Sequence, residues 1–334
     1  MAKKKTLKKI LVTGGSGFLG LHLCRHLIDL GGAQVISFGR STSDELAQMG
    51  VTQLKGSVCD FDSFLAAATD VSEIYHLAGM VSRDRDDSGE MFELHLTGTR
   101  NLLKVVETLK IQKVVYLSTS GVVGVSKQTH LANENSKFAW DHIRKWPYYE
   151  SKAMAEQEVQ RAIAKGLAIK IARPALLLGP GDHRGSSHGD VLKFLSGDVK
   201  SALPGGLCAV DARDVANFLP ILMEKGEVGV GYLMGAQNLS IRAFLNHLAQ
   251  LSGVDAPLLD LPRELIDRAP SVFKFLSKQS IFGGIDEQTF EMGCCYWYID
   301  SSRAEALGFK ARTLGETLSD ALVDLKKMGF YWSE

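Results

Sequence analysis

The sequence lacks the features that mark membrane-spanning, secreted and nucleic-acid-binding proteins. No apolar run approaches the roughly 18 residues that cross a bilayer, and no signal-peptide pattern opens the chain. The 38 basic and 38 acidic residues give a formal net charge of zero, so the charge balance provides no reason to expect a nucleic acid partner. We therefore expect a cytoplasmic protein that has no transmembrane segment and binds no nucleic acid.

Cysteine is also scarce, and its placement excludes a disulfide framework and a zinc site. The five cysteines are odd in number and scattered, with no C-x-x-C pair among them. Two histidines stand five residues apart in the glycine-rich stretch 182–189, but no third ligand lies near them in the sequence. We expect reduced thiols, no bound metal, and a flexible loop on the substrate side at 182–189.

What the sequence does contain is a glycine-rich turn between an apolar run and an amphipathic stretch. The run Ile10–Thr13 leads into Gly14, Gly17 and Gly20, and the amphipathic stretch continues over 21–27. In this context the glycines allow a tight turn, close approach to a pyrophosphate and close packing of the helix, whose N-terminus directs N–H groups at the phosphates. We predict that this turn binds a dinucleotide through Gly14, Ser16, Gly17, Phe18, Leu19 and Gly20.

Short apolar runs alternate with amphipathic stretches through the first half of the chain. This rhythm is typical of parallel strands that are covered by helices on both faces. We predict an α/β fold with a doubly wound parallel sheet of the Rossmann type. Residues 1–175 are expected to form the dinucleotide-binding domain, with parts of 207–235 returning to it, and residues 176–334 mainly a smaller C-terminal substrate lobe. The strand-like runs are Ile10–Thr13, Gln34–Phe38, Val51–Lys55, Ile74–Leu77, Val114–Leu117 and Ala168–Ala172.

The end of the second run bears on the choice between NAD and NADP. An NAD-binding unit places a carboxylate about 20 residues after the glycine turn, where it holds the ribose 2′-hydroxyl. This chain has Gly39, Arg40 and Ser41 there and no acid. Because a guanidinium binds a 2′-phosphate through charge-assisted hydrogen bonds, Arg40 favours NADP(H), with NAD(H) as the less favoured cofactor. The alternative is that Arg40 is a solvated turn residue.

A tyrosine and a lysine stand one helical turn apart, at Tyr148 and Lys152. Side chains at positions i and i+4 share a helix face, so we expect the lysine ammonium to lower the phenol pKa from its usual value of about 10. Tyr148 would then exchange a proton with a carbonyl or alcohol oxygen near neutral pH. Lys152 is also placed to bond the ribose next to the nicotinamide.

The fifth run ends in three hydroxyl residues, Ser118, Thr119 and Ser120, at the sheet edge where a ligand is expected. We select Ser120 rather than Thr119 as the hydroxyl that polarises the substrate oxygen. An ordinary cap at the end of the strand is the structural alternative.

Together these motifs resemble the extended short-chain dehydrogenase/reductase family, within the NAD-dependent epimerase/dehydratase superfamily. The matching segments follow in the family's order over nearly the whole chain: 13–20, 76–79, 117–120, 148–152, 173–182 and 210–216. The resemblance implies that Tyr148 is the acid/base, Lys152 its partner and Ser120 the hydroxyl that positions the oxygen. It also implies a homodimer, and cofactor contacts from Ser57, Val58, Leu77, Ala78, Gly79 and Pro174 besides the glycine turn, Tyr148 and Lys152.

The chain departs from the family's pattern at two positions. Where the family often has Asn-x-x-Gly-Thr, this chain begins the motif with His95, which puts a proton relay through that asparagine in doubt. We interpret His95 as a packed or locally bonded histidine, with a relay-water ligand as the alternative, and leave it out of the catalytic set. Ser57 replaces an aspartate commonly used on the adenine, so adenine contacts are expected from backbone groups near Ser57 and Val58.

The segment 173–182 narrows the expected substrate. It lacks the asparagine typical of sugar-nucleotide enzymes and carries three leucines, so it resembles the dihydroflavonol reductase and 3β-hydroxysteroid dehydrogenase branch. This implies an NADP(H)-dependent enzyme that interconverts a ketone and a secondary alcohol on a hydrophobic small molecule. The alternatives are a nucleotide-sugar epimerase or dehydratase with retained NAD(P), and a non-catalytic NADP-sensing module.

An apolar stretch over 265–284 is consistent with a hydrophobic substrate. It reads as an apolar helix that ends at Gly283 and Gly284 and forms a mobile wall over an apolar pocket. The alternatives are plain packing inside the lobe, and contact with a membrane surface, because lysines and aromatic residues alternate there.

Overall fold

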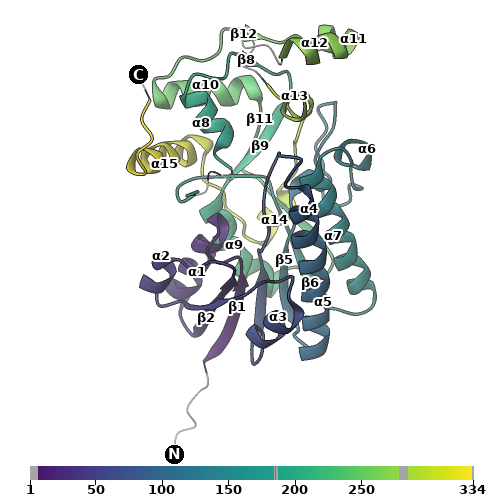
Figure 1. Ribbon diagram of the computed structural model, residues 1–334, viewed down its shortest axis with the longest axis vertical. Coiled ribbons are helices and arrows are strands. Elements are labelled where there is room, and N and C mark those ends of the chain that lie inside the picture. The colour runs from purple at the N-terminus through teal and green to yellow at the C-terminus, as the bar shows by residue number, and fades with distance from the viewer. Residues whose placement is uncertain (1–6, 184, 186, 278–284, 333–334) are drawn as a thin grey trace, which may run out of the picture.

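The computed structural model describes residues 7–183, 185, 187–277 and 285–332, and a seven-stranded parallel sheet forms its base (Figure 1). Every pair of neighbouring strands in this sheet is parallel, which confirms the predicted doubly wound α/β fold. In spatial order the strands are β10 (Gly231–Met234), β6 (Ile169–Pro174), β5 (Lys113–Leu117), β4 (Glu73–His76), β1 (Lys8–Thr13), β2 (Ala33–Gly39) and β3 (Thr52–Lys55).

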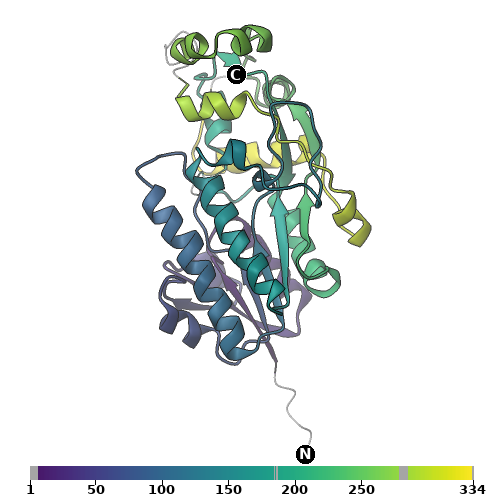
Figure 2. The ribbon, with the colours of Figure 1, turned by 90° about the vertical axis from the view of Figure 1, so that its right-hand side faces the viewer.

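Helices cover both faces of this sheet because successive strand residues point to opposite sides. Leu11 of β1 packs with α3, α5 and α7, whereas Val12 packs with α1 and α9. Figure 2 shows α5 and α7 running side by side along one face. The covering helices are α1 (Phe18–Leu30), α3 (Phe61–Ala67), α5 (Gly98–Leu109), α7 (Pro147–Ala164) and α9 (Ala212–Lys225).

A smaller lobe lies beyond the carboxyl ends of the sheet strands (Figure 1). Its three-stranded sheet has the order β11 (Gln237–Ser240), β9 (Gly206–Asp211) and β7 (Leu176–Leu178), and β8 (Ser201–Ala202) pairs with β12 (Leu259–Asp260). A third apolar core joins these strands to α8, α10 and α15. The remaining elements are α2 (Asp44–Gln48), α4 (Ser88–Phe92), a π-helical turn (Glu93–Thr97), a 3-10 turn (Ser120–Val122), α6 (Trp140–Ile143), α8 (Gly189–Leu195), α10 (Ile241–Ser252), α11 (Arg263–Arg268), α12 (Pro270–Ser277), α13 (Glu287–Gly293), α14 (Ser302–Leu307) and α15 (Leu314–Lys327).

The stretch expected to form one apolar helix over 265–284 contains two short helices. A break at Ala269 separates α11 from α12, and Pro270 starts the second helix, where its missing N–H is tolerated. Ile266 packs into a small core with Leu203 and Phe290. The double glycine at 283–284 lies outside the described residues. Within the described parts of the chain, no helix is both long and apolar enough to cross a membrane.

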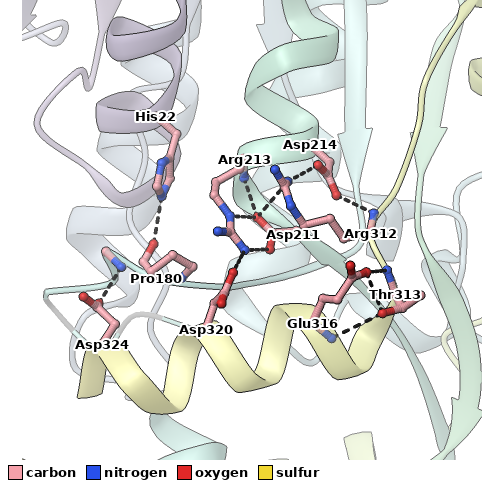
Figure 3. Close-up of polar contacts among 11 residues, drawn as sticks. His22, Pro180, Asp211, Arg213, Asp214, Arg312, Thr313, Glu316, Asp320 and Asp324 are labelled. Atoms are coloured by element: carbon pink, nitrogen blue, oxygen red, sulfur yellow. Dashed lines mark hydrogen bonds and ion pairs between the residues drawn. The ribbon is translucent and has the colours of Figure 1, made fainter. Parts of the chain in front are cut away.

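A charged network fastens the C-terminal helix α15 to the start of α9 (Figure 3). The buried carboxylate of Asp211 accepts two hydrogen bonds from the Arg213 guanidinium, at 2.9 and 2.7 Å, and Arg213 also pairs with Asp320 of α15 at 2.7 Å. Asp214 accepts the backbone N–H of Arg312 at 2.7 Å. Because Asp211 is fully buried, its paired guanidinium offsets the cost of removing the carboxylate from water.

The same helix holds the loop that follows β7. Asp324 of α15 accepts the N–H of Gly181 at 2.7 Å, and His22 of α1 lies 2.8 Å from the carbonyl oxygen of Pro180 (Figure 3). The loop is therefore tied both to the helix after the glycine turn and to the end of the chain. These contacts fix one wall of the cleft described next.

Candidate functional site

A cleft of about 1340 Å³ runs along the carboxyl ends of the sheet strands and is lined on its other side by residues of the smaller lobe. Ligand sites of doubly wound sheets lie at this edge. All of the residues that the sequence selected line this one cleft: Gly14, Ser16, Gly17, Phe18, Leu19, Gly20, Arg40, Ser57, Val58, Leu77, Ala78, Gly79, Ser120, Tyr148, Lys152 and Pro174.

The glycine turn forms a cradle that only glycine can build. Gly14 has φ +72°, and a Cβ there would lie 2.9 Å from the backbone nitrogen of Ala78. A Cβ on Gly20 would lie 2.2 Å from the Gly14 carbonyl oxygen. Gly17 caps α1 and has no side chain to occupy the helix N-terminus, which faces the cleft. Backbone N–H groups and a helix dipole at an open cradle fit a pyrophosphate.

Arg40 lies at the rim of the cleft, beyond the glycine turn. Its side chain is 61% exposed, and its guanidinium bonds the carboxylate of Glu90 on α4 at 2.5 Å. Nearby, the hydroxyls of Ser16 and Ser41 lie 3.2 Å apart. An exposed ion pair of this kind contributes little to stability, so a competing phosphate can displace the carboxylate at small cost.

Tyr148 and Lys152 project from the first turns of α7, which starts at Pro147. Lys152 is 6% exposed and donates a hydrogen bond to the Leu117 carbonyl at 2.7 Å. Burial lowers the pKa of Lys152 to about 8, because the interior disfavours the ammonium.

The expected lowering of the Tyr148 pKa is wrong for this structure. Burial raises the pKa of Tyr148 above its usual value, and the nearby Tyr149 raises it further, while a hydrogen bond to the Thr119 side chain opposes both effects. The i, i+4 spacing correctly places Lys152 one turn away. The spacing carries no information on burial, which has the largest effect on the pKa of Tyr148.

Among the described residues, the Thr119 side chain is close enough to Tyr148 to lower its pKa, whereas Ser120 is not among the groups that affect this pKa. Thr119 is extended at the end of β5, and its hydroxyl also accepts the N–H of Gly121 at 3.3 Å. Ser120 begins the 3-10 turn, where its carbonyl accepts the N–H of Gly124 at 2.7 Å.

The lobe side of the cleft holds residues that the sequence reasoning missed. Tyr149 packs against Trp297, with ring centroids 4.8 Å apart, and Met292 and Leu203 extend this apolar wall. By contrast, the loop 182–189 was predicted from the sequence to lie on the substrate side, and five of its described residues line the cleft: Asp182, His183, Gly185, Ser187 and Gly189. The carboxylate of Asp182 accepts the N–H groups of residues 187 and 188.

An ion pair crosses from the sheet side of the cleft to the lobe. Arg83, in the loop after β4, donates two hydrogen bonds to the two carboxylate oxygens of Asp190 on α8, at 2.7 and 2.6 Å. The two residues are 107 positions apart, so no local sequence pattern connects them.

The fold and the glycine cradle define a Rossmann-fold protein with a dinucleotide site. The model of the family described as "NAD dependent epimerase/dehydratase family" matches residues 10–235. The chain belongs to this family, which confirms the resemblance inferred from the motifs.

Curated relatives include reductases. The chain is 27% identical over 332 residues to a putative dihydroflavonol 4-reductase of Synechocystis sp., covering 96% of this chain and 95% of the relative. It is 33% identical over 260 residues to sterol demethylase protein B of Methylococcus capsulatus, covering 77% and 78%. It is 36% identical over 180 residues to 2-alkyl-3-oxoalkanoate reductase of Stenotrophomonas maltophilia, covering 53% of each chain.

A solved structure has the same fold over almost its whole length. The crystal structure of gox2253 superimposes with a TM-score of 0.84 at 25% identity, covering 96% of this chain and 99% of that one. The likeness therefore extends over both the sheet and the lobe.

Proposed function

We propose that this protein is an NADP(H)-dependent reductase that converts a ketone on a hydrophobic small molecule into a secondary alcohol. One observation carries the proposal: Tyr148 and the buried Lys152 lie one helical turn apart on α7, in a cleft that also contains the glycine cradle and the hydroxyl residues after β5. A nicotinamide cofactor bound in this cleft would supply the hydride. Tyr148 supplies the proton to the substrate oxygen.

The protonation state of Tyr148 favours the reductive direction. The phenol is protonated at neutral pH, and a protonated phenol is the form that donates to an oxygen on which negative charge develops. Thr119 orients the hydroxyl, and the Lys152 ammonium adds positive charge beside it. Thr119 therefore replaces Ser120 as our first choice for the orienting hydroxyl.

The residues that follow β2, at the rim of the cleft, support NADP(H) as the cofactor. Arg40 is the cation that follows β2, and the carboxylate that would hold a 2′-hydroxyl is missing from that position. We propose that the 2′-phosphate displaces Glu90 from Arg40 and takes its place on the guanidinium. Ser57 and Val58 line the adenine end, and Pro174 the nicotinamide end.

The apolar lining of the lobe side supports a hydrophobic substrate. Tyr149, Trp297, Met292 and Leu203 form a wall that offers few hydrogen bonds and removes apolar surface from water. Two of the relatives are named putative dihydroflavonol 4-reductase and 2-alkyl-3-oxoalkanoate reductase, and reduction of an organic carbonyl compound is consistent with both names.

The test is a panel of ketones of increasing apolar size, with NADPH consumption and alcohol formation measured together. The proposal expects one alcohol per NADPH oxidised with an apolar ketone, and a much slower reaction with NADH. Conversion of a nucleotide sugar without net NADPH consumption would instead identify an epimerase or dehydratase. Tight NADPH binding without turnover of any carbonyl compound would identify a sensing module.

A further inference from the structure

A buried histidine stands between the cofactor side and the helix that carries Tyr148. His95 lies in the π-helical turn between α4 and α5 and is 2% exposed. Such turns insert an extra residue into a helix and occur often at functional sites. The rings of His95 and Tyr148 form a T-shaped pair, with centroids 5.9 Å apart.

Both ring nitrogens of His95 have partners. The N–H of Met80 points at Nε2 over 3.3 Å, and Nδ1 lies 2.8 Å from the hydroxyl of Ser151. Met80 belongs to the loop after β4, which lines the cofactor side of the cleft, and Ser151 precedes Lys152 on α7. One imidazole therefore bridges two walls of the site.

These contacts define the tautomer of His95. A backbone N–H only donates, so Nε2 must accept and carries no proton. The proton of the neutral ring is then on Nδ1 and is donated to the Ser151 oxygen. Ser151 donates its own proton to the Tyr148 carbonyl at 2.9 Å, so every bond in the series runs from the Met80 N–H toward α7.

The surroundings keep this ring neutral. Burial lowers the pKa of His95 well below its usual value, and the positive charge of Lys152 and the neighbouring His76 lower it further, while the backbone of Met80 has a smaller opposing effect. Protonation would also set two donors, Nε2–H and the Met80 N–H, against each other. The space around the ring is full, because a Cβ on Gly79 would lie 3.2 Å from Nε2 and 3.8 Å from the Lys152 Nζ.

We propose that His95 is a positioning residue, fixed as the neutral Nδ1-protonated tautomer, which holds the Tyr148–Lys152 turn of α7 at a set distance from the Met80 loop and passes no proton to the substrate. The proposal rests on the proposed reductase function for its kinetic consequences, but the tautomer follows from the contacts alone. It gives the position a definite role where the family often has asparagine.

Ring nitrogen NMR of histidine-labelled protein tests the tautomer without reference to activity. The signals of His95 are identified by their loss in the His95→Gln variant. We expect a proton on Nδ1, a bare Nε2, and no titration between about pH 5.5 and 8. A proton on Nε2, or titration in that range, would overturn the proposal even if the protein proves not to reduce ketones.

Kinetics of two substitutions test the positioning role. Glutamine offers one donor and one acceptor but cannot titrate, so His95→Gln should keep kcat within about tenfold of the wild type, with an unchanged pH profile. His95→Ala loses both contacts and should lower kcat by more than His95→Gln does, and Ser151→Ala should fall between them. His247→Gln, on α10 of the lobe, is the matched control without effect.

A proton-relay role for His95 predicts a different set of results. If His95 passed a proton, His95→Gln would lose activity as fully as His95→Ala, and imidazole would rescue His95→Ala. Thermal melting of each variant separates loss of fold from loss of positioning. An absence of ketone reduction in the wild type would refute the proposed function and leave the NMR result to decide the tautomer.

Discussion

Lys152 of α7 and Leu117 of β5 are joined by a hydrogen bond from the lysine Nζ to the carbonyl oxygen, over 2.7 Å. The bond ties the helix that carries Tyr148 to the strand that leads into Thr119. The Lys152 ammonium is buried at this position, and its burial lowers the pKa that governs the pH dependence of the reaction.

Activity should fall on the alkaline side of about pH 8. Burial lowers the pKa of Lys152 to about 8, so the ammonium loses its proton there rather than near its usual value of about 10.4. Below this pH kcat/KM should be level, and above it should decline about tenfold per pH unit. Lys152→Arg keeps its positive charge to a much higher pH, so an active Lys152→Arg enzyme should not show the decline of kcat/KM above about pH 8. A wild-type profile level to about pH 10 would contradict the assignment.

The orienting hydroxyl can be identified by a matched pair of substitutions. Thr119→Val removes the partner of Tyr148 and keeps the side-chain shape, so kcat should drop about 10²-fold, whereas Thr119→Ser should recover most of it. Ser120→Ala should change kcat by less than about threefold, because the contacts of Ser120 in the turn are made by its backbone. The reverse order of effects would restore Ser120 as the hydroxyl selected from the sequence.

Arg40 should set the preference between the two cofactors. Arg40→Ala should raise the KM for NADPH by about tenfold to a hundredfold and leave the KM for NADH nearly unchanged, since only the 2′-phosphate contacts the guanidinium. Glu90→Gln removes the competing carboxylate and should lower the KM for NADPH. Equal changes for both cofactors in Arg40→Ala would refute the NADP assignment.

The glycine cradle offers a test with an internal control. Gly14→Ala forces a side chain into positive φ and against the Ala78 backbone, which should cost about 1–3 kcal/mol and weaken dinucleotide binding. Gly315→Ala, in α15 away from the cleft, meets no atom within 4 Å and should lower neither stability nor NADPH binding. Denaturant unfolding and NADPH titration of the two variants measure the difference. Equal stability and equal NADPH affinity of the two variants would show that the turn tolerates a side chain.

The sequence predicts the sheet well because its signal is local. The apolar run Ile10–Thr13 and the glycines after it identify β1 and the turn, since burial on both faces leaves a continuous apolar strand. The pKa of Tyr148 could not be predicted, because the burial that raises it comes from the folded surroundings. The Arg83–Asp190 pair joins residues 107 positions apart and follows from the placement of the lobe.

The measurement that tests the central claim most directly follows a label from NADPH into the product. With NADPH carrying deuterium at the transferred position of the nicotinamide, the account predicts one deuterium on the carbinol carbon per NADPH oxidised. Tyr148→Phe should bind NADPH as tightly as the wild type yet turn over at least about 10²-fold more slowly, whereas Tyr149→Phe should remain active. Product alcohol without deuterium, or full activity in Tyr148→Phe, would contradict the account.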